Sequence, residues 1–141
     1  MAVSQPSHAA PDKCSVYWDY ENMPIPKKCD LAKVVTNIRQ RLWASIGSTM
    51  PIEFKVYIRA SRVTEQIQND FDINGIVQIQ VPSVKPESVD KRMLIDMSFS
   101  LYELERDRKS RAIALISGDK GTSTVHTQYI YDSPFRHDLK F

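Results

Sequence analysis

The sequence contains few cysteines and few glycines, and these two shortages exclude several classes of protein. Its 141 residues include two cysteines and four glycines. Cys14 and Cys29 form neither a CxxC pair nor a disulfide framework, so we expect two reduced thiols, buried or half-buried. No GxGxxG loop, GxxxxGK[ST] loop or Gly-x-Ser-x-Gly turn is present. The sequence therefore predicts neither a dinucleotide-binding domain nor a P-loop NTPase.

Long apolar runs and a strong charge excess are also missing. The longest apolar run, residues 112–116, is far shorter than the roughly 20 residues that a membrane-spanning helix needs. Nineteen basic against seventeen acidic side chains give a net charge of +2, which by itself does not indicate binding to nucleic acid or membrane. The N-terminal segment has no signal-peptide pattern, so we expect a cytoplasmic protein without membrane contact.

The sequence does contain a regular alternation of strand and helix patterns. Apolar spacing predicts helices over 30–46, 63–72 and 88–106, between strands at 15–19, 52–58, 76–81 and 112–116. Asp30 and Gly47 are residue types that begin and end a helix. This order predicts an α/β fold, with a mainly parallel sheet of about four or five strands and helices on both faces.

One domain accounts for most of this length. We expect a disordered leader over 1–13 and a folded domain over 14–119. Residues 120–141 form an atypical C-terminal end, which we interpret as truncated or disordered.

Three aspartates fall where a parallel sheet gathers its ligands. Asp19 closes the first predicted strand, Asp119 follows the fourth, and Asp90 opens the helix after the third. Ligands bind outside the carboxyl ends of such strands, so we expect these side chains on one rim. Two carboxylates about 4 Å apart repel by about 4 kcal/mol at an effective dielectric near 20, and a divalent cation removes that cost. Oxygen ligands without His or Cys favour Mg²⁺ or Mn²⁺.

Each of these residues also has a purely structural interpretation. Asp90 suits the start of a helix, Asp119 suits a turn, and Asp19 suits the end of a strand. We favour a metal site because all three coincide on one rim. Asp96, on a different helix face from Asp90, is a secondary metal candidate. Asn22 is either a site residue that contacts a phosphate or a turn residue before a proline.

Four stretches in order carry a family resemblance. They are residues 16–26 with their Asp-x-Glu-Asn pattern and prolines, Arg62 after the second strand, residues 88–97, and the Ser-Gly-Asp of 117–119. Together they resemble the NYN domains, a branch of the PIN-like nucleases. The resemblance extends over about 15–119 and is closest to the NYN domain of the meiosis regulator and mRNA stability factor type.

The resemblance implies a PIN-like three-layer sandwich and a metal-dependent endoribonuclease that cleaves single-stranded RNA in RNA turnover or regulation of gene expression. The catalytic, metal-binding carboxylates would then be Asp19, Asp90 and Asp119, with Mg²⁺ or Mn²⁺ as the cofactor. The substrate-binding residues would be Asn22, Arg62, Lys91 and Arg92. The resemblance also leaves open protein partners in RNA regulation and association with RNA granules or peroxisomes.

The last motif departs from the family pattern. Gly121 stands where relatives usually carry a second aspartate, and the residues after it do not resemble the family's next helix and strand. An alternative function is therefore a catalytically impaired RNA-binding or adaptor module of the same fold. A weaker alternative is a receiver-like or small-nucleotide-binding α/β domain.

Overall fold

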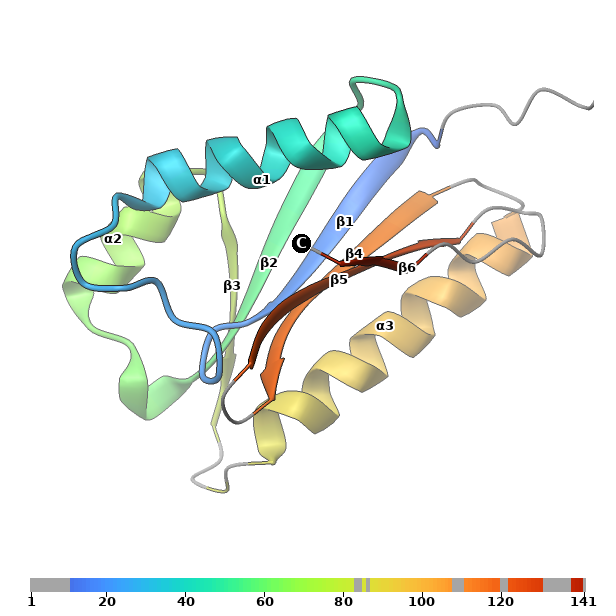
Figure 1. Cartoon of the computed structure of the whole chain (residues 1–141). Helices are drawn as coiled ribbons and strands as arrows, with labels where there is room; N and C mark the ends of the chain where they lie inside the picture. The colour runs from blue at the N-terminus through green and yellow to red at the C-terminus, as the bar shows by residue number, and fades with distance from the viewer. Residues whose placement is uncertain are drawn as a thin grey trace, which may run out of the picture.

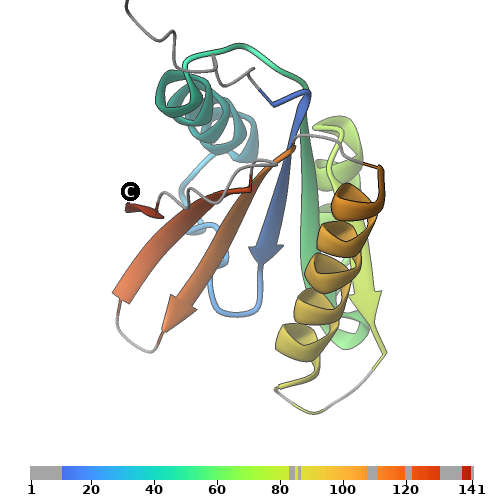
Figure 2. The ribbon, with the colours of Figure 1, turned by 90° about the vertical axis from the view of Figure 1, so that its right-hand side faces the viewer.

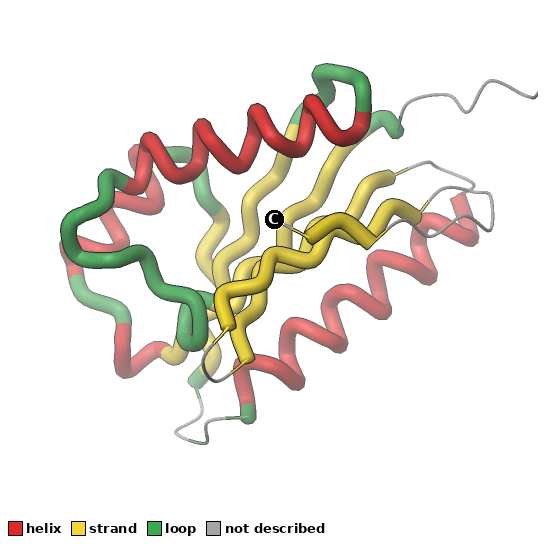
Figure 3. The backbone as a smooth tube through the Cα atoms, viewed as in Figure 1, coloured by secondary structure: helices red, strands yellow, loops and turns green. Residues whose placement is uncertain are grey.

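The computed structural model describes residues 11–82, 85, 87–107, 111–119, 122–130 and 138–140 (Figure 1). For residues 105, 107 and all described residues from 118 onward, it describes the backbone alone. Strands and helices alternate along most of this chain (Figure 3). In order, the elements are β1 (Lys13–Asp19), α1 (Leu31–Ile46), β2 (Ile52–Arg59), the 3₁₀ turn η1 (Ala60–Arg62), α2 (Glu65–Ile73), β3 (Val77–Val81), α3 (Ser88–Asp107), β4 (Arg111–Asp119), β5 (Thr122–Ile130) and β6 (Asp138–Lys140).

A single sheet of six strands runs through the described part of the chain, in the order β3-β2-β1-β4-β5-β6. The first four strands of this order are parallel, whereas β5 pairs antiparallel with β4 and β6 pairs antiparallel with β5. The predicted α/β fold with a mainly parallel sheet is therefore confirmed. The two antiparallel strands lie within the C-terminal end, residues 120–141, where no strand was predicted.

Helices cover both faces of the parallel strands, as predicted. Figure 1 shows α1 above the sheet and α3 below it, and Figure 2 shows α3 in front of the half of the sheet that contains β2 and β3. One core joins α1 and α2 to residues such as Val16 and Phe54, and the other joins α3 to Tyr17 and Tyr57. Successive side chains of a strand point to opposite faces, so β1 contributes to both cores.

The helix ends follow from local capping residues. The Asp30 carboxylate accepts a hydrogen bond from the backbone N–H of Ala32 at 3.0 Å, and Gly47 ends α1 with φ 80°. Both roles were predicted from residue type, because Asp satisfies an unpaired N–H group and glycine adopts positive φ at little cost. The Thr64 hydroxyl caps α2 in the same way, through the N–H of Ile67 at 3.1 Å.

Several boundaries differ from the predicted ones by a few residues. β1 begins at Lys13, and β4 continues to Asp119 instead of ending at 116. β4 is longer because β5 pairs with it along its whole length. No helix among the described residues is long and apolar enough to cross a membrane.

The two cysteines differ in exposure. Both thiols are free; Cys14 is buried in the core on β1, whereas Cys29 is exposed. The expectation of a buried or half-buried thiol is therefore wrong for Cys29, which lies on the surface loop between β1 and α1.

Candidate active site

The candidate site lies at the carboxyl ends of β1 and β4, where the strand order reverses. The chain proceeds outward from β1 to β2 and β3, then returns through α3 to β4 on the other side of β1. Such a reversal leaves a crevice beyond the strand ends in open α/β sheets. The last residues of β1 and β4 are Asp19 and Asp119.

Asp19 is a buried carboxylate, with 1% of its surface exposed. It lies two residues after Tyr17, which belongs to the core beneath α3, so its side chain is directed to the α3 face of the sheet. In the register of β1 with β2, Asp19 is level with Tyr57. A carboxylate this deeply buried needs partners, because unpaired buried charge is costly.

Asn22 supplies two of these partners. Its side-chain amide Nδ2 donates to Asp19 Oδ2 at 2.7 Å, and its backbone N–H donates to Oδ1 at 3.3 Å. The loop that carries Asn22 is itself fixed, since the Trp18 indole N–H donates to the carbonyl of Met23 at 2.8 Å. Asn22 was predicted as a substrate-binding residue; in this geometry its amide holds the Asp19 carboxylate in place.

Asp90 approaches Asp19 from the first turn of α3. Partial burial, a hydrogen bond with the Asp19 carboxyl group and the negative charge of Asp19 together raise the pKa of Asp90 to about 6. Two carboxyl groups in contact cannot both ionise without repulsion, so the pair retains a proton more readily than either group alone. The structure thus brings together two of the three predicted metal-binding carboxylates.

Asp119 is at the same rim, but only its backbone is described. Trp18 of β1 is level with Ile116 of β4, so the Asp119 backbone lies beyond the level of Asp19 along the strand direction. It pairs with Thr122 at the start of the β4–β5 hairpin. Among the described side chains, no group of three or more His, Cys, Asp and Glu residues is arranged to hold a metal ion.

Asp96, the secondary metal candidate, lies deeper along α3 and has other partners. The Tyr57 hydroxyl donates to Asp96 Oδ2 at 2.8 Å, and Arg92 Nε lies 3.2 Å from Asp96 Oδ1. Burial and the Asp96 carboxylate both raise the pKa of the Tyr57 hydroxyl. Arg92, which was predicted to bind substrate, thus forms an ion pair with Asp96, one turn further along α3.

Glu21 ties the loop after β1 to the end of β2. Its Oε1 accepts the backbone N–H of Arg59 at 2.8 Å, and its Oε2 lies 3.3 Å from the Arg59 guanidinium. Arg62, another predicted substrate-binding residue, lies 3.9 Å from the same oxygen, and its side chain is 64% exposed. Lys91, the last of these residues, is exposed on α3.

Sequence reasoning did not identify Tyr57 or Arg59 as supports of the site. Both are on β2, whose strict alternation marked it as a strand but gave no sign of its partners. Tyr57 is level with Asp19 across the β1–β2 register, and that register was the missing information.

Comparison with known proteins assigns most of the chain to a family. The model of the NYN domain matches residues 13–127, which includes β1 through most of β5. No curated protein matches the chain.

Proposed function

This chain belongs to the NYN domain family of PIN-like nucleases, and on that basis we propose that it is a divalent-metal-dependent endoribonuclease domain that cleaves single-stranded RNA. The observation that carries the proposal is the contact between Asp19 and Asp90 at the point where the strand order reverses. A role in RNA turnover or regulation of gene expression and a cytoplasmic location complete the proposal, on the strength of the family resemblance.

The donor set fits Mg²⁺ or Mn²⁺. Asp19 and Asp90 present hard oxygen atoms, and their mutual repulsion favours a bound cation. Asp119, at the end of β4, is the third residue that we propose for this site. When bound, a divalent cation there supplies positive charge that activates water and stabilises the leaving oxygen of the phosphodiester.

The chain's own residues hold and orient this site. Asn22 fixes the Asp19 carboxylate through two hydrogen bonds, so that its oxygen atoms need no rearrangement to bind a ligand. Lys91 is exposed on the first turns of α3 and would contact RNA phosphates, as would Arg62 beside Glu21. Arg92 would contact phosphate only after leaving Asp96.

A second candidate function is an RNA-binding or adaptor module with impaired catalysis. The observation that favours it is the strand β5, which begins three residues after Asp119 and turns back along β4. Together with Gly121, this hairpin stands where family members usually continue with a second aspartate and a helix. One missing carboxylate weakens cation binding because fewer oxygen ligands remain.

The test is cleavage of single-stranded RNA in Mn²⁺, in Mg²⁺ and in EDTA. A linear end-labelled RNA and a circular RNA of the same sequence separate endonuclease from exonuclease activity, since only an endonuclease opens the circle. We expect both RNAs to be cut when the metal is present. Asp19→Asn should abolish cleavage, whereas Asp72→Asn, which changes an exposed aspartate of α2, should leave cleavage intact.

Circular dichroism of each variant verifies that it is folded. Cleavage that persists in Asp19→Asn would overturn the proposed active site. A folded chain that binds RNA in EDTA but cuts neither substrate would establish the second candidate in place of the first.

A further inference from the structure

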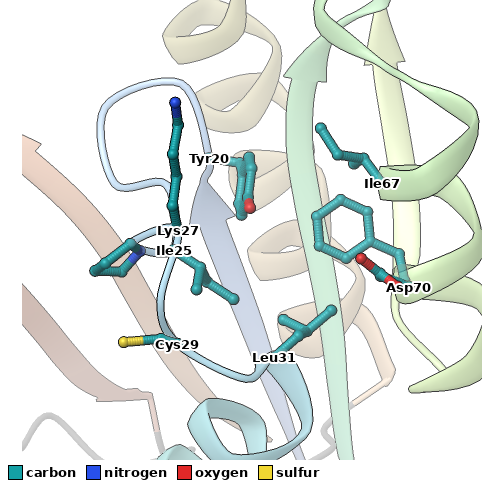
Figure 4. Close-up of a pocket in the computed structure, with 9 residues that line it drawn as sticks. Tyr20, Ile25, Lys27, Cys29, Leu31, Ile67 and Asp70 are labelled. Carbon is teal, nitrogen blue, oxygen red and sulfur yellow. The ribbon is translucent and has the colours of Figure 1, made fainter.

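A pocket of about 170 Å³ lies between the β1–α1 loop and α2 (Figure 4). Its apolar walls come from Ile25 and Leu31 on one side and from Ile67 and Phe71 on the other. The volume is smaller than the roughly 300 Å³ at which pockets for drug-sized ligands begin, so it suits a single ring system.

The walls of this pocket are held in place before any ligand arrives. The Tyr20 ring meets the Phe71 ring edge-on, with centroids 5.1 Å apart, and the Phe71 side chain is itself buried. The loop is closed by a hydrogen bond from the Cys29 backbone N–H to the carbonyl of Pro26 at 2.9 Å. A pocket with fixed walls loses little conformational entropy when it binds a ligand.

The chain connects the pocket to the Asp19–Asp90 pair at the carboxyl end of β1. Tyr20, which lines the pocket, directly follows Asp19 in the chain. Tyr20 packs against the core beneath α1 and α2, whereas Asp19 lies on the α3 face. An RNA strand with a phosphate at Asp19 therefore needs only to pass over the end of β1 to bring a neighbouring base to the pocket.

The polar groups of the pocket match a base that carries adjacent N–H donors. Asp70 contributes a half-buried carboxylate, whose Oδ1 accepts from Gln66 Nε2 at 3.0 Å. Among the described residues, no hydrogen bond to its Oδ2 is seen. Lys27 adds a positive charge at the exposed loop wall. A carboxylate accepts two parallel N–H groups, and among the four RNA bases guanine presents such a pair on its Watson–Crick edge.

The Tyr20 hydroxyl is a further donor at the pocket. Burial raises its pKa, a hydrogen bond from the Ile25 backbone N–H opposes this shift, and the Asp70 charge adds to it. A tyrosine hydroxyl is protonated at neutral pH even without this increase, so it is available as a donor.

We propose that this pocket binds a guanine base of single-stranded RNA next to the nucleotide whose phosphate lies at Asp19 and Asp90, with Asp70 as the residue that recognises the guanine. The proposal rests on the proposed function for the identity of the polymer. The proposed hydrogen bonds between Asp70 and guanine need no bound cation.

Cys29 provides a reporter for the test, because it lines the pocket and is exposed. The other thiol, Cys14, is buried, and burial raises its pKa to about 12, so it reacts far more slowly. The experiment measures the rate at which a small disulfide reagent modifies Cys29 in EDTA, with guanosine, inosine or uridine 5′-monophosphate present at millimolar concentration. Inosine differs from guanosine only in lacking the exocyclic amino group.

We expect guanosine monophosphate to slow the modification of Cys29, and uridine monophosphate to leave the rate unchanged. Inosine monophosphate should protect about tenfold more weakly than guanosine monophosphate, because one hydrogen bond to a charged acceptor is lost. Asp70→Asn should remove the difference between guanosine and inosine. Asp72→Asn, on the same helix but outside the pocket, should retain it.

Equal protection by all three nucleotides, or none by any, would overturn the guanine site. The result is separable from the nuclease test because the labelling needs neither a metal ion nor cleavage. Protection by guanosine monophosphate in a chain that cuts no RNA would support the pocket and count against the nuclease. RNA cleavage without protection by guanosine monophosphate would support the nuclease and count against the guanine pocket.

Discussion

The two ends of the parallel strands carry acidic residues in opposite electrostatic settings. At the amino end, Glu53 on β2 lies between two lysines, 2.6 Å from Lys13 Nζ and 3.2 Å from Lys55 Nζ. At the carboxyl end, Asp19 and Asp90 lie against each other. At the amino end Glu53 is thus paired with cations of the chain itself, whereas Asp19 and Asp90 at the carboxyl end bring two like charges together.

The pKa shifts of these acids follow from that difference. Partial burial alone would raise the pKa of Glu53, but the hydrogen bonds from Lys13 and Lys55, together with the positive charges of these lysines, outweigh it and lower the pKa below its usual value. For Asp90, partial burial and the neighbouring Asp19 act in the same direction and raise the pKa to about 6. Burial is common to both ends, so the charge of the neighbours decides the sign. A site in which neighbouring carboxylates lack a compensating positive charge is a candidate for binding a cation.

The largest effect should come from breaking the like-charged pair with Asp90→Asn. In EDTA at pH 7.5, we expect the variant to be at least as stable as wild type, because the repulsion with Asp19 is gone. Saturating Mn²⁺ should stabilise wild type by about 2.7 kcal/mol at a hundred times the dissociation constant, which raises the melting temperature by roughly 10 °C. The variant should show little of this increase in a thermal melt.

Glu53→Gln serves as the matched control at the opposite end of the strands. It also removes one carboxylate, yet it should retain the full Mn²⁺-dependent increase in melting temperature. An undiminished increase in Asp90→Asn, or an equal loss in both variants, would show that the cation does not bind at the carboxyl end.

A smaller effect should follow from Asn22→Ala, which keeps both acids but removes the amide that holds Asp19. Residues that orient a metal ligand typically contribute about 10- to 100-fold to affinity or activity. We expect Mn²⁺ affinity, measured by titration calorimetry, and RNA cleavage to fall together by such a factor. Asn37→Ala, on the exposed face of α1, should change neither quantity. A drop in cleavage with unchanged Mn²⁺ affinity would instead assign Asn22 to the RNA.

Much of the fold could be predicted from the sequence because its signals are local. Asp30 and Gly47 mark the ends of α1 by residue type, and strand alternation needs only neighbouring residues. The strands β5 and β6 were missed for a different reason. Residues 122–130 are rich in β-branched residues, which is a local strand signal, but the segment was interpreted from its departure from the family pattern instead, and β6 has only three residues.

The candidate site also has features that could be predicted from the sequence and features that could not. The placement of Asp19 and Asp90 on one rim was predicted, because topology alone brings the strand ends together. The hydrogen bond from Asn22 and the ion pair between Arg92 and Asp96 were not, because they depend on side-chain geometry. The pocket beside Tyr20 gave no sequence signal, since its walls come from a loop and a helix far apart in the chain.

Glu53→Gln should itself have a modest effect on stability with a defined pH dependence. Its pKa is lowered on folding, so the stabilisation by Lys13 and Lys55 is fully present above the unfolded value of 4.5 and is lost as the pH falls through the folded pKa. At pH 7, we expect a loss of about 0.5 to 1 kcal/mol, the range of ion pairs that water still reaches.

Urea unfolding at pH 7 and at pH 3 measures this difference between the variant and wild type. It should shrink toward zero at the lower pH. A difference that is constant with pH would mean that the lysines do not stabilise Glu53 by charge.

The smallest expected effect concerns two cations beside the like-charged pair. Arg92 is paired with Asp96 as Lys13 is paired with Glu53, whereas Lys91 makes no ion pair among the described residues. We therefore expect Lys91→Ala to weaken RNA binding in EDTA by roughly threefold and to reduce the slope of log affinity against log salt by about one, as for the loss of one phosphate contact. Arg92→Ala should change the salt slope much less, since its charge is already balanced within α3. Equal salt slopes for both variants would mean that Arg92 leaves Asp96 to contact the RNA. Ion pairing within the chain would then not determine which cations at the carboxyl end bind phosphate.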